Sequence, residues 1–356
     1  MLDICGSTSI YPLDLYLRLD KLPYKMTPDL MTSICEIVLD AKSYERAENM
    51  ILKAHKVSVS DDEARHVVDT IGSLVFNADL AKAQRARKLY EDGLIPHDHS
   101  RNGTLYLSTD GAYVNTRFIV NDSGWHECKL ALAFHDFDVE EYHTAQSDDA
   151  MNIMHKKYRG LIGTVDDFKW NMLALALENG YGAFKKTVLL ADGAPWIRLM
   201  QESLFPCAIR ILDRYHLFEN VGKYGNAMIK GKNAEARRTE WNDATCKKLD
   251  EGKWKEVLGD IEKRFGDKKP PKGIVNLPKY INDNVDAIDY PRYREEGLIT
   301  NTASMESSNK SVTQDRLKGP GKRWNIPTGQ GILSLKAKYE GEEWMDVIRL
   351  VRSTFS

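Results

Sequence analysis

Residues 187–218 read TVLLADGAPWIRLMQESLFPCAIRILDRYHLF, and this stretch decides the expected fold class. Thr187–Ala191 is β-branched or aliphatic throughout, which is typical of a strand buried on both faces, and Asp192-Gly193 follows where the chain must turn. Helical spacing then covers residues 194–204. Its apolar positions fall on one face: Trp196, Leu199, Met200 and Leu204.

The same pattern follows a second time. Cys207–Leu212 is another apolar run that ends at an acid, Asp213, and helical spacing resumes over Tyr215–Val221. Two strand–helix units in series predict parallel strands with helices packed on the sheet. Because such sheets place their chemistry at the carboxyl ends of their strands, Asp192 is a candidate functional residue.

Composition limits the classes of protein to which the chain can belong. With 356 residues, 42% of them hydrophobic, it can bury a core and form two or three domains. No apolar run approaches the roughly 18 residues of a membrane span, and residues 1–19 lack the pattern of a signal peptide, so we expect a cytoplasmic protein with no membrane partner. Five scattered cysteines without a CxxC pair indicate neither a disulfide framework nor a zinc site.

The first hundred residues have helical spacing. A helix, a short connector and a second helix are predicted over 43–75, with Ser60 as the N-cap of the second. This pattern fits a helix-turn-helix or an ordinary helical hairpin. We favour the hairpin, because the acids at 61–63 would repel phosphate from a recognition helix. A further, basic helix is predicted over Leu80–Glu91.

From residue 104 the spacing becomes alternating. TLYLSTDGAYVNTR and WHECKLALAFHDF flank the turn signal at 121–124, which predicts an antiparallel hairpin. A helix is expected over Val165–Leu177, and its inward positions are Phe168, Met172, Leu175 and Ala176. Residues 219–300 show charged helical segments and little strand signal. A last helix is predicted over Ala303–Leu317, and it stops at Gly319-Pro320-Gly321.

This order of elements predicts an α/β protein with a ribonuclease H-like mixed sheet as its core. We expect four parts: a helical domain at 1–100 that is a candidate for DNA binding, the first part of the core at 101–218, a helical insertion at 219–300, and a catalytic helix with a packed tail at 301–356. The net charge of −2 does not by itself indicate nucleic acid. Basic residues nevertheless gather after Glu306 with little acidic compensation: Lys310, Arg316, Lys318, Lys322 and Arg323.

Three acids stand out by context. Asp110 interrupts a β-type run, Asp192 ends a buried strand, and Glu306 lies on a predicted helix near Asn309. Taken alone, the Asp-Gly pair at 110–111 indicates a hairpin turn, and a single helical Glu indicates a solvated face. In a ribonuclease H-like sheet, however, the three would converge. Three carboxylates suit two Mg²⁺ ions about 3.5–4 Å apart, for which Mn²⁺ could substitute.

Several ordered motifs carry a family resemblance: STDGAYV at 108–114 with HECKL, ADGAPWI at 191–197, ILDRYHLFENV at 211–221, and MESSNKSVTQDRLKGPGKRW at 305–324. With the early pieces YPLDLYLRL and SYERA, they resemble the DDE transposases of bacterial insertion sequences, most closely the ISLre type, a relative of the Mutator-like group. The resemblance implies that Asp110, Asp192 and Glu306 are the catalytic, metal-binding acids. It also places His216 where Mutator-like relatives have the His of a CxxH motif, with Asp213 in place of the Cys.

The expected function is therefore Mg-dependent cleavage of an element's DNA ends and strand transfer to target DNA, by a homo-oligomer assembled on DNA. The five basic residues after Glu306 would contact DNA, and Asp213, His216 and Asn309 are accessory candidates. Alternatively, His216 is an ordinary helix-start histidine. Two other functions stay open: a transposase-derived DNA-binding protein that does not cut, and a ribonuclease H-like nuclease without strand transfer.

Overall fold

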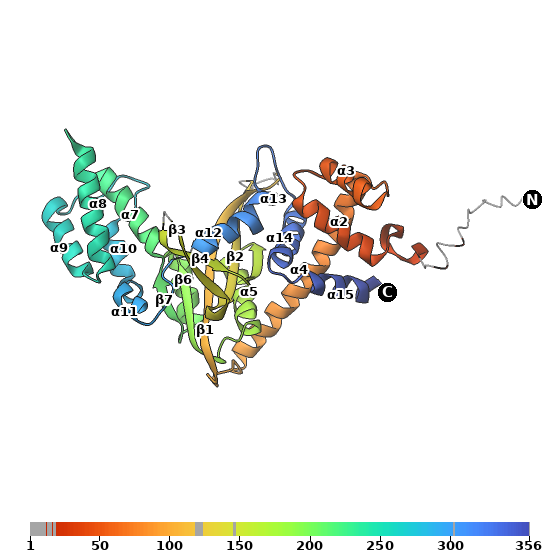
Figure 1. Ribbon diagram of the computed structural model, residues 1–356, viewed down its shortest axis with the longest axis horizontal. Coiled ribbons are helices and arrows are strands. Elements are labelled where there is room, and N and C mark those ends of the chain that lie inside the picture. Colours follow the sequence, from red (N-terminus) through yellow and green to blue (C-terminus); the bar gives the residue numbers. More distant parts are fainter. Residues whose placement is uncertain are drawn as a thin grey trace, which may run out of the picture.

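The structure is a computed structural model that describes residues 19–117, 124–144, 147–301 and 303–355, together with Pro12 and Tyr16 (Figure 1). Most of the YPLDLYLRL piece and of the predicted turn at 121–124 lies outside these residues. From one end of Figure 1 to the other, a group of helices from the middle of the chain, the sheet, and the N-terminal helices follow one another.

Within the described residues, five strands form one mixed sheet in the order β5-β2-β1-β6-β7. Their bounds are Arg101–Asn115 for β1, Trp125–His135 for β2, Lys157–Ile162 for β5, Phe184–Ala191 for β6 and Ile209–Leu212 for β7. β1, β2 and β5 pair antiparallel, whereas β6 and β7 run parallel to β1. The predicted hairpin and both predicted parallel strands are confirmed. β5 was not predicted, and neither was the separate ribbon of β3 (Val139–Thr144) and β4 (Ser147–Ile153).

Side chains of the central strands alternate between two cores, as the twofold period of a strand requires. Leu105 and Leu107 of β1 enter one core, together with alternate residues of β6, while Tyr106 enters the other. The Asp-Gly pair lies inside the ladder, because Asp110 is opposite Leu130 and Gly111 is opposite Lys129. The hairpin-turn interpretation of this pair is therefore wrong.

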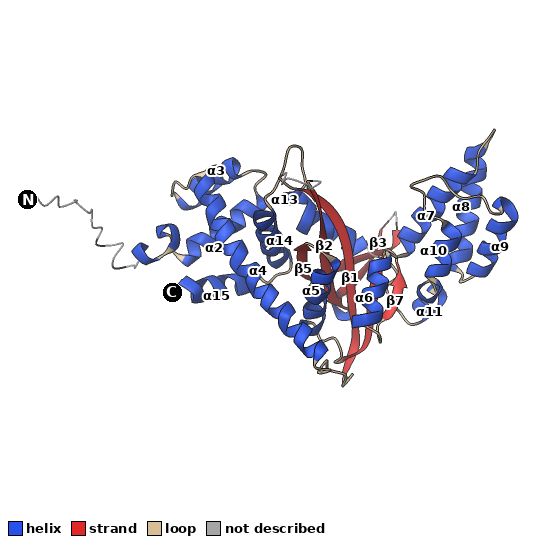
Figure 2. Ribbon diagram, turned by 180° about the vertical axis from the view of Figure 1, so that it is seen from behind, coloured by secondary structure: helices blue, strands red, loops and turns tan. Residues whose placement is uncertain are grey.

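Helices cover both faces of the sheet (Figure 2). On one face lie α5 (Val165–Glu178) and α6 (Pro195–Leu204), and the four predicted inward residues of α5 are all buried. On α6 the prediction fails at Leu199, which is 66% exposed, and Ile197 is buried instead. The helix begins at Pro195, so the inward face is set by Ile197, Met200 and Leu204.

The N-terminal helices are α2 (Pro28–Asp40), α3 (Tyr44–His55) and α4 (Asp61–Glu91). Ser60 caps α4 as predicted, since its hydroxyl accepts from the amide of Glu63 while the Glu63 carboxylate accepts from the amide of Ser60. The two helices predicted over 61–91 are one continuous helix. This long helix, α4, packs on α5, and that tertiary contact stabilises it as a single helix.

Residues 326–340 form α14 (Ile326–Glu340), which the sequence placed in a tail. That tail was expected to pack on the core, and α14 does so: it is buried along nearly its whole length between α4 and β5. Small residues allow the close approach: Gly72 of α4 faces Gly331, and Gly160 of β5 lies under Leu333. The last helix, α15 (Trp344–Phe355), packs against α2.

Alanine ordinarily stabilises a helix relative to glycine, but the contact between Gly72 and Gly331 predicts the opposite effect at position 72. A Cβ at Gly72 would lie 2.6 Å from the Cα of Gly331, so Gly72→Ala should destabilise the protein by about 1–3 kcal/mol through overpacking. In Gly259→Ala on α9 (Trp254–Phe265), the new methyl meets no atom within 4 Å. That control should stabilise by about 0.5–1 kcal/mol. Equal effects of the two changes in denaturant unfolding would contradict the packing argument.

After β7 the chain is helical: α7 (Arg214–Met228), α8 (Ala234–Asp250), α9, α10 (Leu277–Asp283) and α11 (Tyr290–Glu295). Residues 219–300, all of them described, contain no strand, as predicted. α11 covers the edge strand β7, because the hydroxyls of Tyr290 and Tyr293 donate to the carbonyls of Leu212 and Arg210. None of the described helices is long and apolar enough to cross a membrane.

Candidate active site at the ends of the parallel strands

The register of β1 and β6 brings two of the predicted acids together. Ser108 is opposite Leu190, and its hydroxyl donates to the Leu190 carbonyl at 2.9 Å. Asp110 and Asp192 each follow two residues later, so both extend the same face of neighbouring parallel strands. That face carries Tyr106 and Leu190, and the helical segment 303–317 packs on it.

The helical segment is the predicted helix with an irregular middle. It consists of α12 (Ala303–Ser308), the π-helical η5 (Asn309–Gln314) and α13 (Asp315–Leu317). The extent predicted over Ala303–Leu317 is confirmed. A π-helical turn widens the helix and is frequent at functional sites. Here it places Asn309, which is 3% exposed, directly over β1.

Asp110 is held by two hydrogen bonds. One carboxylate oxygen accepts from the Gly111 amide at 2.7 Å, and the other accepts from the Asn309 side-chain amide at 2.6 Å. The Oδ1 atom of Asn309 is buried and has no hydrogen-bond partner among the described residues. Since a buried acceptor without a partner is costly, this oxygen is available to a cation or a donor that enters beside Asp110.

Asp192 begins the turn after β6. Its carboxylate accepts from the Ala194 amide at 2.9 Å, and the Tyr280 hydroxyl donates to its backbone carbonyl at 2.6 Å. Gly193 has a φ of +82°, and a Cβ there would meet Leu212 and Tyr280, so only glycine fits this turn. Burial raises the pKa of Asp192 above its ordinary value, and the Asp110 carboxylate raises it further, against the Ala194 amide and His216.

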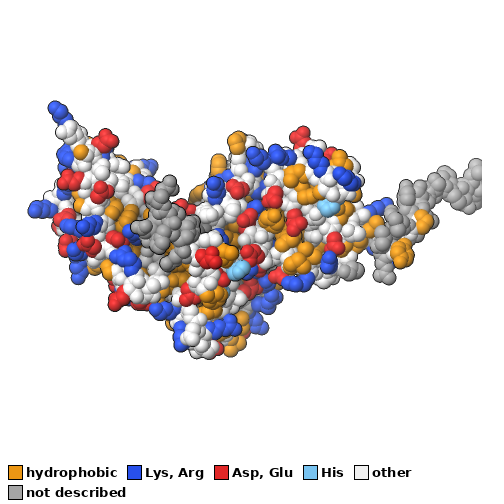
Figure 3. Space-filling view, in the orientation of Figure 1, with side chains coloured by type: hydrophobic (Ala, Val, Ile, Leu, Met, Phe, Trp, Pro, Cys, Tyr) orange, Lys and Arg blue, Asp and Glu red, His pale blue; other side chains and the backbone are white. Residues whose placement is uncertain are grey.

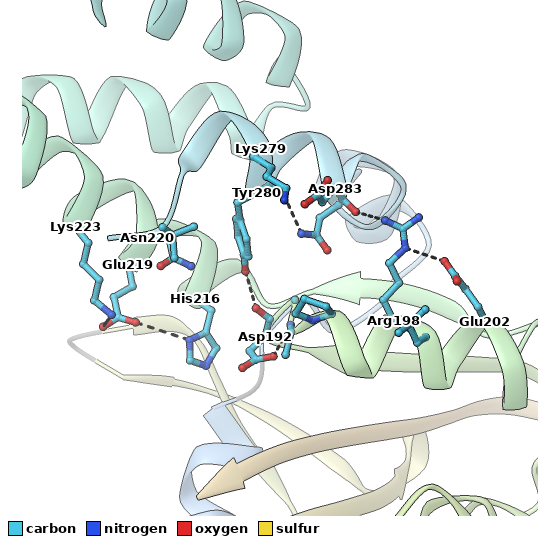
Figure 4. Close-up of a pocket in the computed structure, with 16 residues that line it drawn as sticks. Asp192, Arg198, Glu202, His216, Glu219, Asn220, Lys223, Lys279, Tyr280 and Asp283 are labelled. Carbon is cyan, nitrogen blue, oxygen red and sulfur yellow. Dashed lines mark hydrogen bonds and ion pairs between the residues drawn. The ribbon is translucent and has the colours of Figure 1, made fainter. Parts of the chain in front are cut away.

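His216 lies between Asp192 and Glu219 in Figure 4. Its Nε2 atom is 3.8 Å from the Glu306 carboxylate and 4.0 Å from that of Asp213, while Nδ1 is 3.8 Å from Glu219. His216 also borders both pockets of the site. One pocket, of about 660 Å³, contains Asp110 and Glu306, and the other, of about 870 Å³, contains Asp192.

The three acids surround His216 and do not point at one spot. Among the described residues, no group of three or more His, Cys, Asp or Glu side chains is close enough to hold a metal ion. The expected cluster of Asp110, Asp192 and Glu306 is thus not formed in this arrangement. Two of the carboxylates have nearer partners, because the Asn309 amide donates to Asp110 and His216 lies 3.8 Å from Glu306. The Glu306 side chain is 64% exposed, so rotation about its own bonds is unobstructed by packing.

The five basic candidates do not form one surface. Lys310 and Lys318 border the pocket of Asp110 and Glu306. Lys322 and Arg323 border a different pocket. Arg316 corrects the prediction outright: it is 3% exposed, its Nε donates to the Val38 carbonyl, and its guanidinium lies over Tyr44 and Trp324. Arg316 thus borders the pocket of Lys322 and Arg323 from the core side and is not part of an exposed DNA-binding surface.

Asp213 has a structural role. It is 1% exposed and caps α7 by accepting from the amides of Tyr215 and His216. Conversely, no pattern in the sequence indicated that Tyr280 of α10 would contact Asp192, which lies 88 residues earlier in the chain. Lys279 and Asn220 border the same pocket. These three residues reach the pocket of Asp192 only because the helices of 219–300 pack beside β6 and β7.

Comparison with known proteins leaves the function open. No protein-family model matches the sequence, and neither does any curated protein sequence. Among solved structures, the chain is similar to the Drosophila P element transposase strand transfer complex, with 12% identity over 90% of this chain and 93% of that chain, at a TM-score of 0.42. A TM-score that low establishes neither a shared fold nor a shared activity. Function must therefore be argued from the site itself.

Proposed function

We propose that the chain is a DDE transposase of the ISLre type, which cleaves the DNA ends of an insertion sequence and transfers them to target DNA. One observation carries the proposal: Asp110 and Asp192 extend the same face of neighbouring parallel strands, beside the helix of Glu306 and Asn309. Two carboxylates on neighbouring central strands, beside a helix that supplies a third, suit phosphoryl transfer.

We further propose that the sheet is that of the ribonuclease H-like fold. The strand order supports this, since a three-stranded antiparallel meander, β5-β2-β1, continues into two parallel strands, β6 and β7. The helices of 219–300 then interrupt the core between β7 and the Glu306 helix, which is the arrangement expected for an insertion.

Mg²⁺ is the proposed cofactor, with Mn²⁺ as a substitute, and the donor atoms fit it. The site offers the carboxylates of Asp110, Asp192 and Glu306 and the unpartnered oxygen of Asn309, all of them hard oxygen donors. The three acids would hold the cation. Bound there, it would activate the attacking oxygen and stabilise the charge on the scissile phosphate.

The other side chains have positioning roles in this proposal. Asn309 fixes the rotamer of Asp110 through the 2.6 Å hydrogen bond. His216, 3.8 Å from the Glu306 carboxylate, holds the Glu306 side chain near the site when no cation is bound. Lys310 and Lys318 border the pocket of Asp110 and Glu306, where they can neutralise phosphates beside the scissile bond.

A strand-transfer assay tests this function against its two alternatives. The DNA flanking the coding sequence supplies candidate terminal repeats, and a labelled repeat end is incubated with protein, Mg²⁺ and a target plasmid. Cleavage followed by joining to the plasmid supports the transposase. Cleavage without joining would instead establish a nuclease, and tight binding without cleavage a DNA-binding protein derived from a transposase. Sedimentation of the protein with and without the repeat tests the expected homo-oligomer on DNA.

The two lysines give a separate prediction on binding. Lys310 is exposed and Lys318 is half-buried, and neither forms an ion pair with any described carboxylate. Replacing both with Ala should lower the slope of log affinity against log salt by about 0.9 for each phosphate no longer neutralised. A matched control removes Lys268 and Lys269, two exposed lysines of the loop between α9 and α10. An equal slope change in the control would assign Lys310 and Lys318 to a merely solvated surface.

A further inference from the structure

A second, basic pocket of about 550 Å³ lies where the N-terminal helices meet the loop 318–325. Its walls come from the start of α3, the first turns of α4, the end of β1 and the start of α14. Its charged residues are six cations and one acid: Lys42, Arg65, Arg117, Arg316, Lys322, Arg323 and Asp62. In Figure 3, Lys and Arg side chains gather at the edge of the molecule where the loop and α3 adjoin. We call this site the basic pocket.

Backbone pairing holds the walls of the basic pocket in place. The Trp324 amide donates to the Asn115 carbonyl at 3.1 Å, and the Arg117 amide donates to the Trp324 carbonyl at 2.8 Å, so the loop continues the end of β1. The Trp324 indole donates to the Leu317 carbonyl, and the Lys322 ammonium donates to the Arg316 carbonyl. The loop backbone that carries Lys322 and Arg323 is therefore fixed beside β1, and so is the Lys322 ammonium, which lowers the entropy lost when a ligand binds there.

The cations of the basic pocket lack counterions within the described part of the chain. Arg65 forms ion pairs with Asp62 and Asp69, but the other five cations pair with no described carboxylate. Arg316 is the most unusual, because the residue is only 3% exposed and its Nη2 atom has no hydrogen-bond partner among the described residues, although its Nε atom donates to the Val38 carbonyl. A buried charge without a partner is costly unless a ligand of opposite sign approaches.

Two helices also begin at the basic pocket and add to its positive potential. Ser43 is the N-cap of α3, and Asn325 is the N-cap of α14. The Asn325 side chain makes no capping hydrogen bond, so the first amides of this fifteen-residue helix are not satisfied by it. Helix N-termini favour anions, and here they adjoin side chains of the same sign.

We propose that the basic pocket binds a backbone phosphate of the DNA on which the candidate active site acts. This inference rests on the proposed function and adds a second contact point to it. The two sites share one helical segment: Gln314, Asp315 and Lys318 border the pocket of the acids, while Arg316 between them borders the basic pocket. A strand that leaves the acids along this segment reaches the basic pocket. A phosphate bound in the basic pocket would contact both the N-terminal helices and the core.

The test uses cations that are exposed and whose side chains make no hydrogen bond to any residue that the structure describes, so that folding is unaffected. Lys42, Arg117 and Arg323 are replaced together by Ala, while the buried Arg316 is retained. Duplex DNA binding is measured without divalent cations over a range of salt. The slope of log affinity against log salt should fall by about 0.9 or more, with affinity at low salt about tenfold weaker. The control Lys268→Ala, Lys269→Ala, Lys272→Ala loses the same charge from another loop and should retain the wild-type slope.

A second arm separates a DNA phosphate from a free anion. Inorganic phosphate should raise the melting temperature of the wild type but not of the triple variant, because a ligand that binds the folded state stabilises it. Stabilisation by phosphate together with an unchanged DNA slope would overturn the proposal in favour of a free-anion site. No effect in either arm would overturn the site altogether. Both arms omit cleavage, so a protein that binds as expected but does not cut would refute the proposed function and leave this inference intact.

Discussion

Asp192→Asn is expected to reduce DNA cleavage in Mg²⁺ by about 10³-fold or more while DNA binding changes little. The amide keeps the shape of the side chain and can still accept from the Ala194 amide, but it removes a hard anionic oxygen. Binding can even tighten slightly, because one negative charge that faces phosphate is lost. The measurement is strand cleavage of a labelled repeat end, run beside a binding assay on the same DNA.

Two further variants sharpen this test. Asp110→Asn should act like Asp192→Asn, and the double variant should be hardly worse than either, because the acids act as one unit. Asp283→Asn makes the same chemical change on an exposed residue that borders the same pocket as Asp192. Its cleavage rate should stay within about twofold of the wild type. Full cleavage by Asp192→Asn, or equal losses in all three single variants, would show that the acids are not the catalytic site.

The shifted pKa of Asp192 gives the same variant a second readout. Burial and the nearby Asp110 carboxylate raise its pKa, so the ionised form is disfavoured in the folded state. The sign follows: a raised folded pKa adds stability below the unfolded pKa, and that stability is lost as pH rises through the folded value. At neutral pH the ionised carboxylate therefore costs stability, and Asp192→Asn should raise the melting temperature. At a pH below the unfolded pKa the gain should vanish.

The elements predicted best are those that begin or end at a residue with a special backbone requirement, such as glycine or proline. β6 stops at Asp192-Gly193 because Gly193 must adopt a positive φ, and α6 begins at Pro195, which cannot continue a ladder. Such signals act over a few residues and can be found without tertiary information. The proximity of Asp110 and Asp192 was expected from the predicted ribonuclease H-like sheet, in which the middle of the first strand and the end of the fourth are neighbours. The register that places both acids on one face is known only from the structure.

The misses share a different cause, which is that burial of a charged residue depends on distant partners. β5 carries Arg159 and Gly160 within six residues and does not look like a strand. Arg159 is 2% exposed because acids from three other segments surround it, and Gly160 is needed because Leu333 presses on it. Arg316 failed in the same way: its charge suggested a DNA contact, whereas Tyr44 and Trp324 enclose it.

Replacement of Arg159 is expected to have the largest effect on stability, because Arg159 is buried among several acids. Its guanidinium lies 3.2 Å from Asp79 of α4, 2.5 Å from Glu178 of α5 and 3.0 Å from Glu343 before α15. Lys338 of α14 is the second cation, at 3.0 Å from Asp79 and 3.4 Å from Glu343. Arg159→Met retains much of the volume but leaves Asp79 and Glu343 with Lys338 as their only ion-pair partner among the described cations, while Glu178 keeps Lys82. Removing one partner of a buried charge cluster typically costs about 3–5 kcal/mol, which urea unfolding would detect.

At acidic pH most of the difference in unfolding free energy between wild type and Arg159→Met should disappear. This distinguishes the loss of a charge interaction from a simple packing defect. Burial alone would raise the pKa of Glu343, but Arg159 and Lys338 outweigh it and hold the pKa below its ordinary value. A lowered folded pKa adds stability above the unfolded pKa, near 4.5, that is lost as pH falls through the folded value. The gap between wild type and Arg159→Met should therefore narrow below that pH. Arg349→Met, which removes an exposed partner of Asp346, should cost no more than about 1 kcal/mol. A gap that persists unchanged in acid would mean that Arg159 stabilises the fold through packing.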